Sequence, residues 1–341
     1  MRFSFFVMRF ISVVCCSCLA ACSGGDRRVY VIDGQTMGTS YKVKLVSQDL
    51  LTSEEDSLRS IVQERLNEVD ELMSTYKDSS DVSRINRGLI GVNIQVSALT
   101  TQVLLESVSL GEMTGGRFDV TIGPLIDLWG FGSKLTTAQM PAKFEIDAAL
   151  ARIGLDSLMV EVKNNTVKKL GNIEVDLSAI AKGFGVDRVS EALLSLGYLN
   201  FLIEVGGEIF VSGVNIQGKQ WVLGIEEPDF EGRKAYTTVG IKTGALATSG
   251  DYRNYKEVSG QRYSHTIDPV TGYPVSHRLA SVSVLSPRCS MSDALATALM
   301  VMGEVEGYKF ALENKVDAYF IFREGDGFAT KSTGQFSQLI N

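Results

Sequence analysis

The chain has 341 residues, a formal net charge of −7 and a hydrophobic fraction of 45%. An acidic chain is repelled by the phosphates of nucleic acid, so we expect no nucleic-acid partner. The length suffices for one large domain or for two halves that share a cleft.

The first 21 residues have the pattern of a secretory signal rather than of a membrane span. Arg2 and Arg9 accompany an apolar run that closes on small residues. The segment LAAC at 19–22 is similar to the bacterial lipobox, in which the cysteine is diacylated and becomes the new N-terminus. We therefore expect 1–21 to be removed and Cys22 to carry lipid; an ordinary signal peptide with a chance cysteine is the alternative.

The cysteine count supports a protein held together by its core. Three of the five cysteines leave with the signal and one carries the lipid, so Cys289 is the only thiol that remains. One thiol cannot form an internal disulfide. We expect 22–28 to be a lipid-anchored tether and 29–341 to be one domain that faces the periplasm, on a membrane that the sequence does not specify.

Helical spacing and alternation predict the elements that follow. After strands at 29–32 and 41–46, Ser53 is expected to cap a helix whose apolar positions recur from Leu58 to Met73. Further helices are expected at 97–113, at 178–196 and from about Ser292. Strands are expected at 173–177, 201–205, 209–211, 221–225, 237–241, 280–285, 318–322 and 328–331. Strands without regular βαβ alternation predict an α+β fold with mixed or antiparallel sheets and packed helices.

The stretch from 176 to 185 is typical of an anion site. A strand ends at Asp176, and a helix begins at Ser178 with Lys182 in its first turns. A helix N-terminus beside a lysine favours an anionic ligand. The alternative is a capped helix with a solvated lysine. The sequence has no Walker loop or Rossmann fingerprint, so a nucleotide would be held in another way.

Asp293 and Thr297 are four residues apart near the start of a predicted helix, so their oxygens share one face. Two such ligands, completed by a carbonyl and by water or phosphate, suit magnesium rather than zinc. Alternatively, Asp293 is a helix cap or a partner of the helix dipole.

Several motifs follow one another along the chain. They are MGT at 37–39, MSTY at 73–76, GGRFDVTIGPLIDLWGFG at 115–132, DLSAIAKGFGVDRV at 176–189, EVGGE at 204–208, SGDYRNY at 249–255, YSHTIDPVTGYPV at 263–275 and SDALATALMVMG at 292–303. Together they cover nearly the whole mature chain and resemble, in the family's order, the ApbE family of FAD:protein FMN transferases.

The resemblance implies two halves around a central FAD cleft and magnesium-dependent transfer of FMN from FAD to a Thr or Ser hydroxyl, with release of AMP. It implies metal ligation by the Asp293 carboxylate, the Thr297 hydroxyl and the Ala179 carbonyl. The FAD contacts that it implies are Met37, Tyr76, Arg117, Phe118, Asp119, Asp176, Lys182 and Ile267. The rings of Tyr76 and Phe118 would lie against a ring system or, alternatively, belong to the core.

Both histidines of the chain lie in the stretch 262–277. His265 matches the family's motif histidine, and its pKa range suits a general base for the acceptor hydroxyl. A hydrogen-bonded structural histidine is the alternative. His277 lies outside the motif and is expected to be a loop residue.

The resemblance also implies the partner, a subunit of a membrane redox complex that carries Asp-x-x-Thr/Ser-Gly-Ala/Ser-Thr/Ser. Residues 268–272 of this chain begin that pattern and then depart at Tyr273 and Pro274. We therefore expect Thr271 and Gly272 to form a turn rather than a site of self-flavinylation. An FAD pyrophosphatase and a non-catalytic FAD-binding lipoprotein are the alternatives to a transferase.

Overall fold

The computed structural model describes residues 27–132, 140–228, 234–252, 255–258 and 261–340. Within them, eight strands form one sheet in the order β1-β2-β6-β7-β10-β13-β14-β15, and every neighbouring pair is antiparallel. The strands are β1 (Arg28–Thr36), β2 (Thr39–Ser47), β6 (Phe201–Val205), β7 (Glu208–Ser212), β10 (Gly244–Gly250), β13 (Leu279–Ser286), β14 (Asp317–Glu324) and β15 (Gly327–Ser332).

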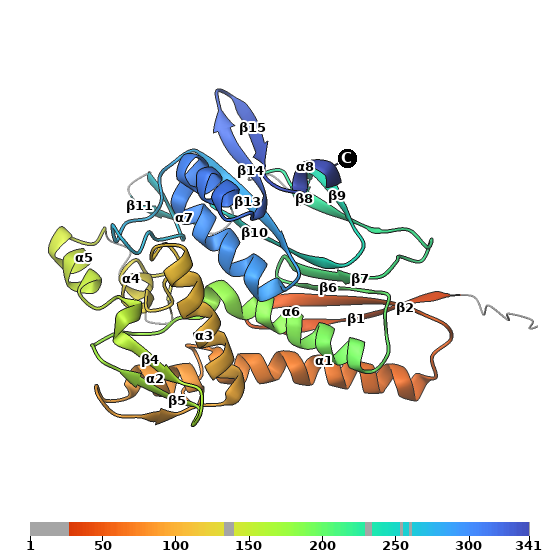
Figure 1. Cartoon of the computed structure of the whole chain (residues 1–341), viewed down its shortest axis with the longest axis horizontal. Coiled ribbons are helices and arrows are strands. Elements are labelled where there is room, and N and C mark those ends of the chain that lie inside the picture. Colours follow the sequence, from red (N-terminus) through yellow and green to blue (C-terminus); the bar gives the residue numbers. More distant parts are fainter. Residues whose placement is uncertain (1–26, 133–139, 229–233, 253–254, 259–260, 341) are drawn as a thin grey trace, which may run out of the picture.

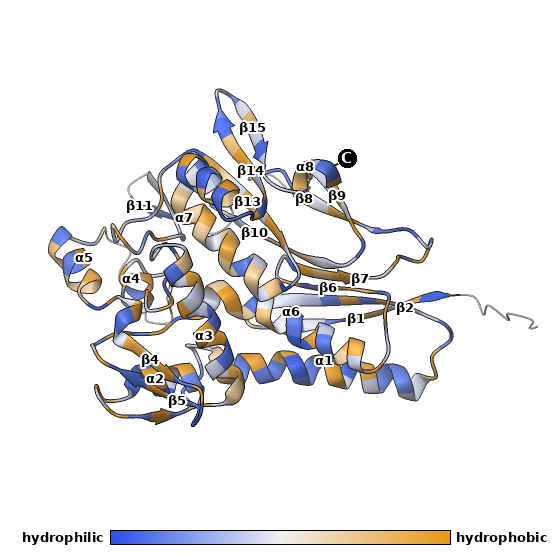
Figure 2. Ribbon diagram, in the orientation of Figure 1, coloured by the Kyte–Doolittle hydropathy of each residue, from blue (hydrophilic) through white to orange (hydrophobic). Residues whose placement is uncertain are grey.

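Long helices cover one face of this sheet (Figure 1). They are α1 (Thr52–Met73), α6 (Ser178–Ser195) and α7 (Cys289–Glu313). Figure 2 shows hydrophilic and hydrophobic residues alternating along α1, as expected for a helix with one buried side. The hairpin of β8 (Trp221–Glu226) and β9 (Ala235–Ile241) shares a hydrophobic cluster with the opposite face, together with α8 (Phe336–Leu339).

Smaller elements lie beside the ends of α1 and α7. A three-stranded sheet has the order β3-β5-β4, and a hairpin of β11 and β12 precedes His265. The elements are α2 (Asp81–Arg87), β3 (Ile94–Gln95), α3 (Ala98–Met113), α4 (Gly123–Leu128), α5 (Lys143–Leu150), a 3-10 turn (Leu155–Ser157), β4 (Leu158–Glu161), β5 (Thr166–Lys169), β11 (Tyr255–Val258) and β12 (Gln261–Ser264). One hydrophobic cluster joins α2, α3 and the three-stranded sheet to α6, α7 and β13, and a separate cluster joins α4 to α5.

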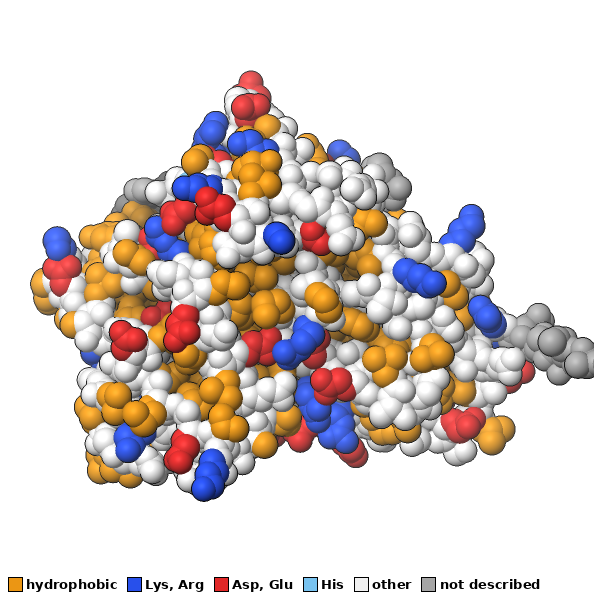
Figure 3. All heavy atoms as spheres, in the orientation of Figure 1, with side chains coloured by type: hydrophobic (Ala, Val, Ile, Leu, Met, Phe, Trp, Pro, Cys, Tyr) orange, Lys and Arg blue, Asp and Glu red, His pale blue; other side chains and the backbone are white. Residues whose placement is uncertain are grey.

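The surface is mixed. Figure 3 shows acidic and basic side chains interspersed among hydrophobic ones on the face that Figure 1 presents. Across the ranges given above, no helix is long and apolar enough to span a bilayer.

The predicted α+β fold with antiparallel sheets is confirmed, and the helix predicted at 97–113 begins as expected. Ser97 caps it by accepting a hydrogen bond from the Thr100 amide at 3.0 Å. The cap predicted for the first helix is wrong: the helix begins at Thr52, and the Glu54 carboxylate accepts from the Leu51 amide.

The strand predicted at 173–177 is also wrong. Ile173, Val175 and Leu177 are buried, so their alternation reflects a segment that runs through the core. Within this segment only Glu174 forms a β-bridge, and its partner is Ile122. Two residues later, the Asp176 amide donates a hydrogen bond to the Val120 carbonyl. Alternation of apolar residues does not distinguish such a buried segment from a strand.

The last long helix begins at Cys289, three residues before the predicted start. Asp187 of α6 supplies the cap, because its carboxylate accepts from the Cys289 amide at 2.6 Å and from the Ser290 amide at 3.0 Å. This cap lies about 100 residues away in the sequence, so no local signal could reveal it. It fixes the start of α7 against α6.

α6 and α7 approach each other closely at Gly183. A Cβ at this position would lie 2.4 Å from the Cys289 carbonyl oxygen. A glycine is therefore required here by packing between two backbones, not by its own conformation.

We predict that Gly183→Ala destabilises the fold by about 1–3 kcal/mol, the usual range for overpacking, because the α7 backbone cannot turn aside as a flexible side chain can. Gly327→Ala is the matched control, since nothing lies within 4 Å of its Cβ position. Urea unfolding followed by circular dichroism measures both. Equal stabilities of the two variants would contradict the packing argument.

Candidate active site

The carboxylate of Asp293 is buried where α6 begins. Its Oδ2 accepts a hydrogen bond from the Gly183 amide at 3.0 Å. In a regular α-helix that amide bonds to the carbonyl four residues earlier, which is Ala179. The Asp293 carboxylate therefore contacts α6 at the amide that faces, along the helix, the carbonyl predicted to bind metal.

Thr297 lies one turn beyond Asp293 on α7, and its Oγ1 is 3.3 Å from the Ser249 hydroxyl of β10. The part of the chain that the structure describes contains no group of three or more His, Cys, Asp or Glu residues that could hold a metal. The donors here are instead one carboxylate, one hydroxyl and one carbonyl. Such an oxygen set leaves coordination positions for water and phosphate, so it fits magnesium better than zinc.

Lys182 lies between two acids rather than in solvent, so the solvated alternative is wrong. Its Nζ is 3.3 Å from Glu208 Oε1 and 3.6 Å from Asp293 Oδ2. Burial lowers the Lys182 pKa, but the two carboxylates outweigh it and raise the pKa above its usual range. The ammonium therefore stays charged.

Glu208 is the residue of this site that the sequence did not single out, although it ends the quoted EVGGE motif. Its burial raises its pKa above the usual range, and the charge of the neighbouring Lys182 ammonium opposes that rise. Burial likewise raises the pKa of Asp293, while Lys182 and the Gly183 amide oppose that rise.

The turn between β6 and β7 lies against the stem of Lys182. Gly206 and Gly207 have φ angles of +61° and +107°, and a Cβ at Gly206 would lie 2.8 Å from Thr39 Cγ2 and 3.4 Å from Lys182 Cδ. The glycines let this turn pass closely over the lysine. They also set the start of β7, where Glu208 lies.

Met37, Tyr76 and Asp176 lie in the β1–β2 turn, shortly after α1 and just before α6, respectively. Met37, in the β1–β2 turn with a φ of 45°, places its Cε 3.0 Å from the Cβ position of Gly185 on α6. Tyr76 follows α1 and is 74% exposed, so its ring is available to a ligand. Asp176 accepts from the Ser178 amide at 2.8 Å and so caps the start of α6.

Phe118 and Ile267 belong to the core. Their side chains are 2% and 3% exposed, and they lie in two separate hydrophobic clusters. Of the two alternatives for the Phe118 ring, a ligand contact or the core, the structure places it among core residues. Backbone atoms of these two residues are the groups that a ligand could contact.

Arg117 and Asp119 already have protein partners. Arg117 Nη1 lies 3.2 Å from Asp268 Oδ2, and its Nη2 lies 2.9 Å from Glu306 Oε2. Asp119 accepts from the amide and hydroxyl of Thr121 at 2.7 and 2.6 Å. Burial raises the pKa of Asp119. The Arg117–Asp268 pair ties the segment before α4 to the turn after His265.

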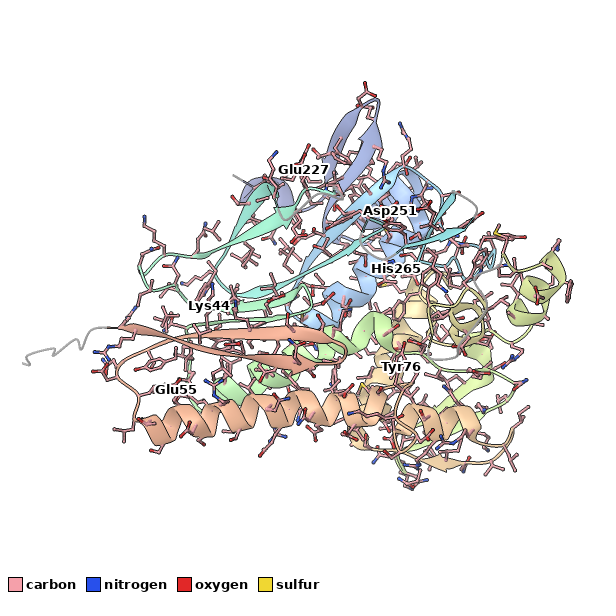
Figure 4. All side chains as sticks on the ribbon, turned by 180° about the vertical axis from the view of Figure 1, so that it is seen from behind. Lys44, Glu55, Tyr76, Glu227, Asp251 and His265 are labelled. Atoms are coloured by element: carbon pink, nitrogen blue, oxygen red, sulfur yellow. The ribbon has the colours of Figure 1, made fainter. Side chains whose placement is uncertain are left out.

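His265 lies between β12 and a turn that the structure confirms. The Gly272 amide donates to the Asp268 carbonyl at 2.8 Å, and Trp129 Nε1 donates to the Gly272 carbonyl at 2.8 Å. The ring of Phe131 meets the imidazole edge-on, with centroids 6.4 Å apart. In the view of Figure 4, Tyr76 and His265 lie one above the other, although they come from distant parts of the chain.

His277 is a loop residue, as predicted, and it lies against a break in α7. Its Nε2 donates to the Met300 carbonyl at 2.7 Å. Gly303 has a φ of 78°, and a Cβ there would lie 2.7 Å from His277 Cδ2. The imidazole therefore caps the part of α7 that carries Asp293 and Thr297.

A pocket of about 420 Å³ lies elsewhere, beside α3 and the start of α7. It contains none of the predicted FAD contacts, and the central FAD cleft stays a prediction. Its lining includes Thr101, Leu105, Glu106 and Arg288.

Comparison with known proteins agrees with these motifs. The family model described as the ApbE family matches residues 37–320. The FAD:protein FMN transferase of Haemophilus influenzae is 40% identical to this chain, and the match covers 96% of this chain and 96% of the relative. The FAD:protein FMN transferase of Vibrio cholerae is 39% identical, and the match covers 95% of this chain and 96% of the relative.

Solved structures agree as well. The flavin transferase ApbE from Vibrio cholerae has a TM-score of 0.84 at 39% identity, covering 92% of this chain and 99% of its own. The flavinyl transferase ApbE of Pseudomonas stutzeri has a TM-score of 0.83 at 36% identity, and the match covers 92% of this chain and 97% of that structure. Because both sequence and fold agree over nearly the whole length, the chain belongs to the ApbE family.

Proposed function

We propose that this protein transfers FMN from FAD to a Thr or Ser hydroxyl of a partner protein and releases AMP. The observation that carries the proposal is the contact of Asp293 with the Gly183 amide of α6, which brings a carboxylate and the Lys182 ammonium together near the N-terminus of that helix. These are the groups that a pyrophosphate and its magnesium ion require. The named activity of the relatives supports the same reaction.

Magnesium, when bound, supplies positive charge that offsets the charge of the pyrophosphate. Asp293, Thr297 and the Ala179 carbonyl would hold it. Lys182 contributes a fixed positive charge beside the helix N-terminus, where anions are favoured. In the transfer the acceptor oxygen bonds to the phosphorus of FMN, and the bond from that phosphorus to the oxygen of AMP breaks.

His265 takes the proton of the acceptor hydroxyl in this proposal. A Thr or Ser hydroxyl is a weak nucleophile near neutral pH until a base removes its proton. Trp129 and the Arg117–Asp268 pair anchor the turn that follows His265. We therefore expect this turn to hold the imidazole in one position relative to the acceptor hydroxyl. Tyr76 and Met37 are the side chains that we propose contact the flavin or adenine rings.

The experiment that tests this function supplies FAD and magnesium with and without a threonine-bearing acceptor peptide. We predict an acceptor heavier by one FMN and an equal amount of AMP, and no such product from Asp293→Asn, because the amide removes the charged metal ligand. Mass spectrometry and nucleotide chromatography measure both.

The matched control is Asp317→Asn, which removes the same charge from the start of β14 and should transfer normally. Free FMN with AMP would establish a pyrophosphatase instead, and intact FAD would establish a non-catalytic binding protein. Normal turnover by Asp293→Asn would exclude Asp293 as a ligand.

We predict that His265→Asn slows transfer by roughly 10²–10⁴-fold, the range for a lost general base. Binding of FAD and magnesium should be retained, because the metal ligands and Lys182 are unchanged. Fluorescence titration with FAD measures binding, and the mass gained by the acceptor measures transfer. Near-normal transfer would show that His265 is structural, and loss of FAD binding would make it a substrate-positioning residue.

We further propose that Cys22 is diacylated and that the protein is anchored to the cell envelope, facing the periplasm. Cys22 lies outside the described residues, so the support is the LAAC sequence alone. The redox-complex subunit with the acceptor motif would then be reached along the membrane.

We predict that Cys22→Ser leaves the protein unlipidated, because the serine hydroxyl does not replace the thiol that is diacylated. Fractionation and the intact mass of the membrane-bound form measure this. A mature chain that starts elsewhere and carries an unmodified Cys22 would contradict the anchor.

A further inference from the structure

The Lys182 ammonium has two counterions, and both are buried. Asp293 is 3% exposed and Glu208 is 4% exposed. Asp293 Oδ2 also accepts a hydrogen bond from the Gly183 amide, so this oxygen serves two donors. Glu208 Oε1 is nearer to the ammonium, at 3.3 Å compared with 3.6 Å for Asp293 Oδ2. The lysine is therefore shared between a predicted metal ligand and an acid with no assigned role.

One oxygen of Glu208 lacks a partner. Its Oε2 is buried and makes no hydrogen bond within the described part of the chain. Buried polar atoms normally find partners, and an unpaired carboxylate oxygen is unfavourable. Glu208 therefore occupies this position at an energetic cost, which favours a role in binding over a role in stability.

A divalent cation and the Lys182 ammonium would compete for the Asp293 carboxylate. Two positive groups a few ångströms apart repel each other, and the repulsion is stronger away from bulk water. If Asp293 were the only acid present, metal binding would leave the lysine without a counterion beside the metal. Glu208 avoids this loss, because its carboxylate remains a counterion of the Lys182 ammonium when Asp293 binds the metal.

We propose that Glu208 is a positioning residue that holds Lys182 for the phosphate ligand and thereby frees Asp293 for the divalent cation. The inference rests on the proposed function and names a residue that neither the motif assignment nor the relatives' names provide. The EVGGE turn explains the placement: Gly206 and Gly207 bring the chain over Lys182, and Glu208 follows as the first residue of β7.

The test is a double-mutant cycle on the purified full chain, with magnesium affinity measured by calorimetry and manganese affinity by electron paramagnetic resonance. Glu208→Gln should weaken both by roughly 10–100-fold, the range found for residues that support metal ligands. Lys182→Met should strengthen binding, because it removes the rival cation. In protein that already carries Lys182→Met, the loss of metal affinity caused by Glu208→Gln should be roughly tenfold smaller than in the wild-type protein.

Equal losses in both backgrounds would overturn the proposal, since Glu208 would then act on the metal without Lys182. Unchanged affinity in Glu208→Gln would overturn it too. Glu304→Gln is the matched control: Glu304 is also buried and is paired with Arg278, outside this site, so its loss should leave metal affinity unchanged. Metal affinity that falls equally in Glu304→Gln would show a general effect of charge and also overturn the proposal.

Thermal unfolding shows whether each variant is folded. If Glu208→Gln does not fold, Glu208→Asp carries the test, because it keeps the charge and withdraws the carboxylate from Lys182; weaker magnesium binding supports the proposal, and unchanged binding overturns it. Failure of the wild-type protein to bind magnesium would instead refute the metal-dependent function. The two failures are therefore distinguishable.

Discussion

The hydrogen bond from the Gly183 amide to Asp293 is the interaction on which the site depends. It exists because α6 and α7 approach so closely that no side chain fits at Gly183. The same contact brings a carboxylate of one helix to an amide near the N-terminus of another. Helix packing and the chemistry of the site are therefore one feature of this fold.

Two acids maintain that arrangement, one on α6 and one at the start of β7. Asp187 caps α7 by accepting its first amides, so the helix that carries Asp293 begins at a fixed point. Glu208 reaches the Lys182 ammonium from the start of β7. A buried carboxylate is unfavourable by itself, and each of these acids is offset by amides or by an ammonium. Removal of one partner would leave the other charge uncompensated.

The histidine turn is built independently of the helix contact. Its anchors are Trp129, which donates to the Gly272 carbonyl, and Arg117, which pairs with Asp268. The proposed general base is therefore placed without disturbing the groups that we propose hold phosphate and metal. The two tasks that we propose, binding a pyrophosphate and activating a hydroxyl, fall on separately supported parts of the structure.

The sequence by itself determined the α+β class, the helix at 97–113 and the one-face pairing of Asp293 with Thr297, because these follow from local periodicity and spacing. Its motifs also identified the family. Only the tertiary structure decided that Phe118 is a core residue, that 173–177 is not a strand and that Glu208 belongs to the site. Each of these depends on contacts between residues far apart in the chain, which leave no periodic or local signal in the sequence.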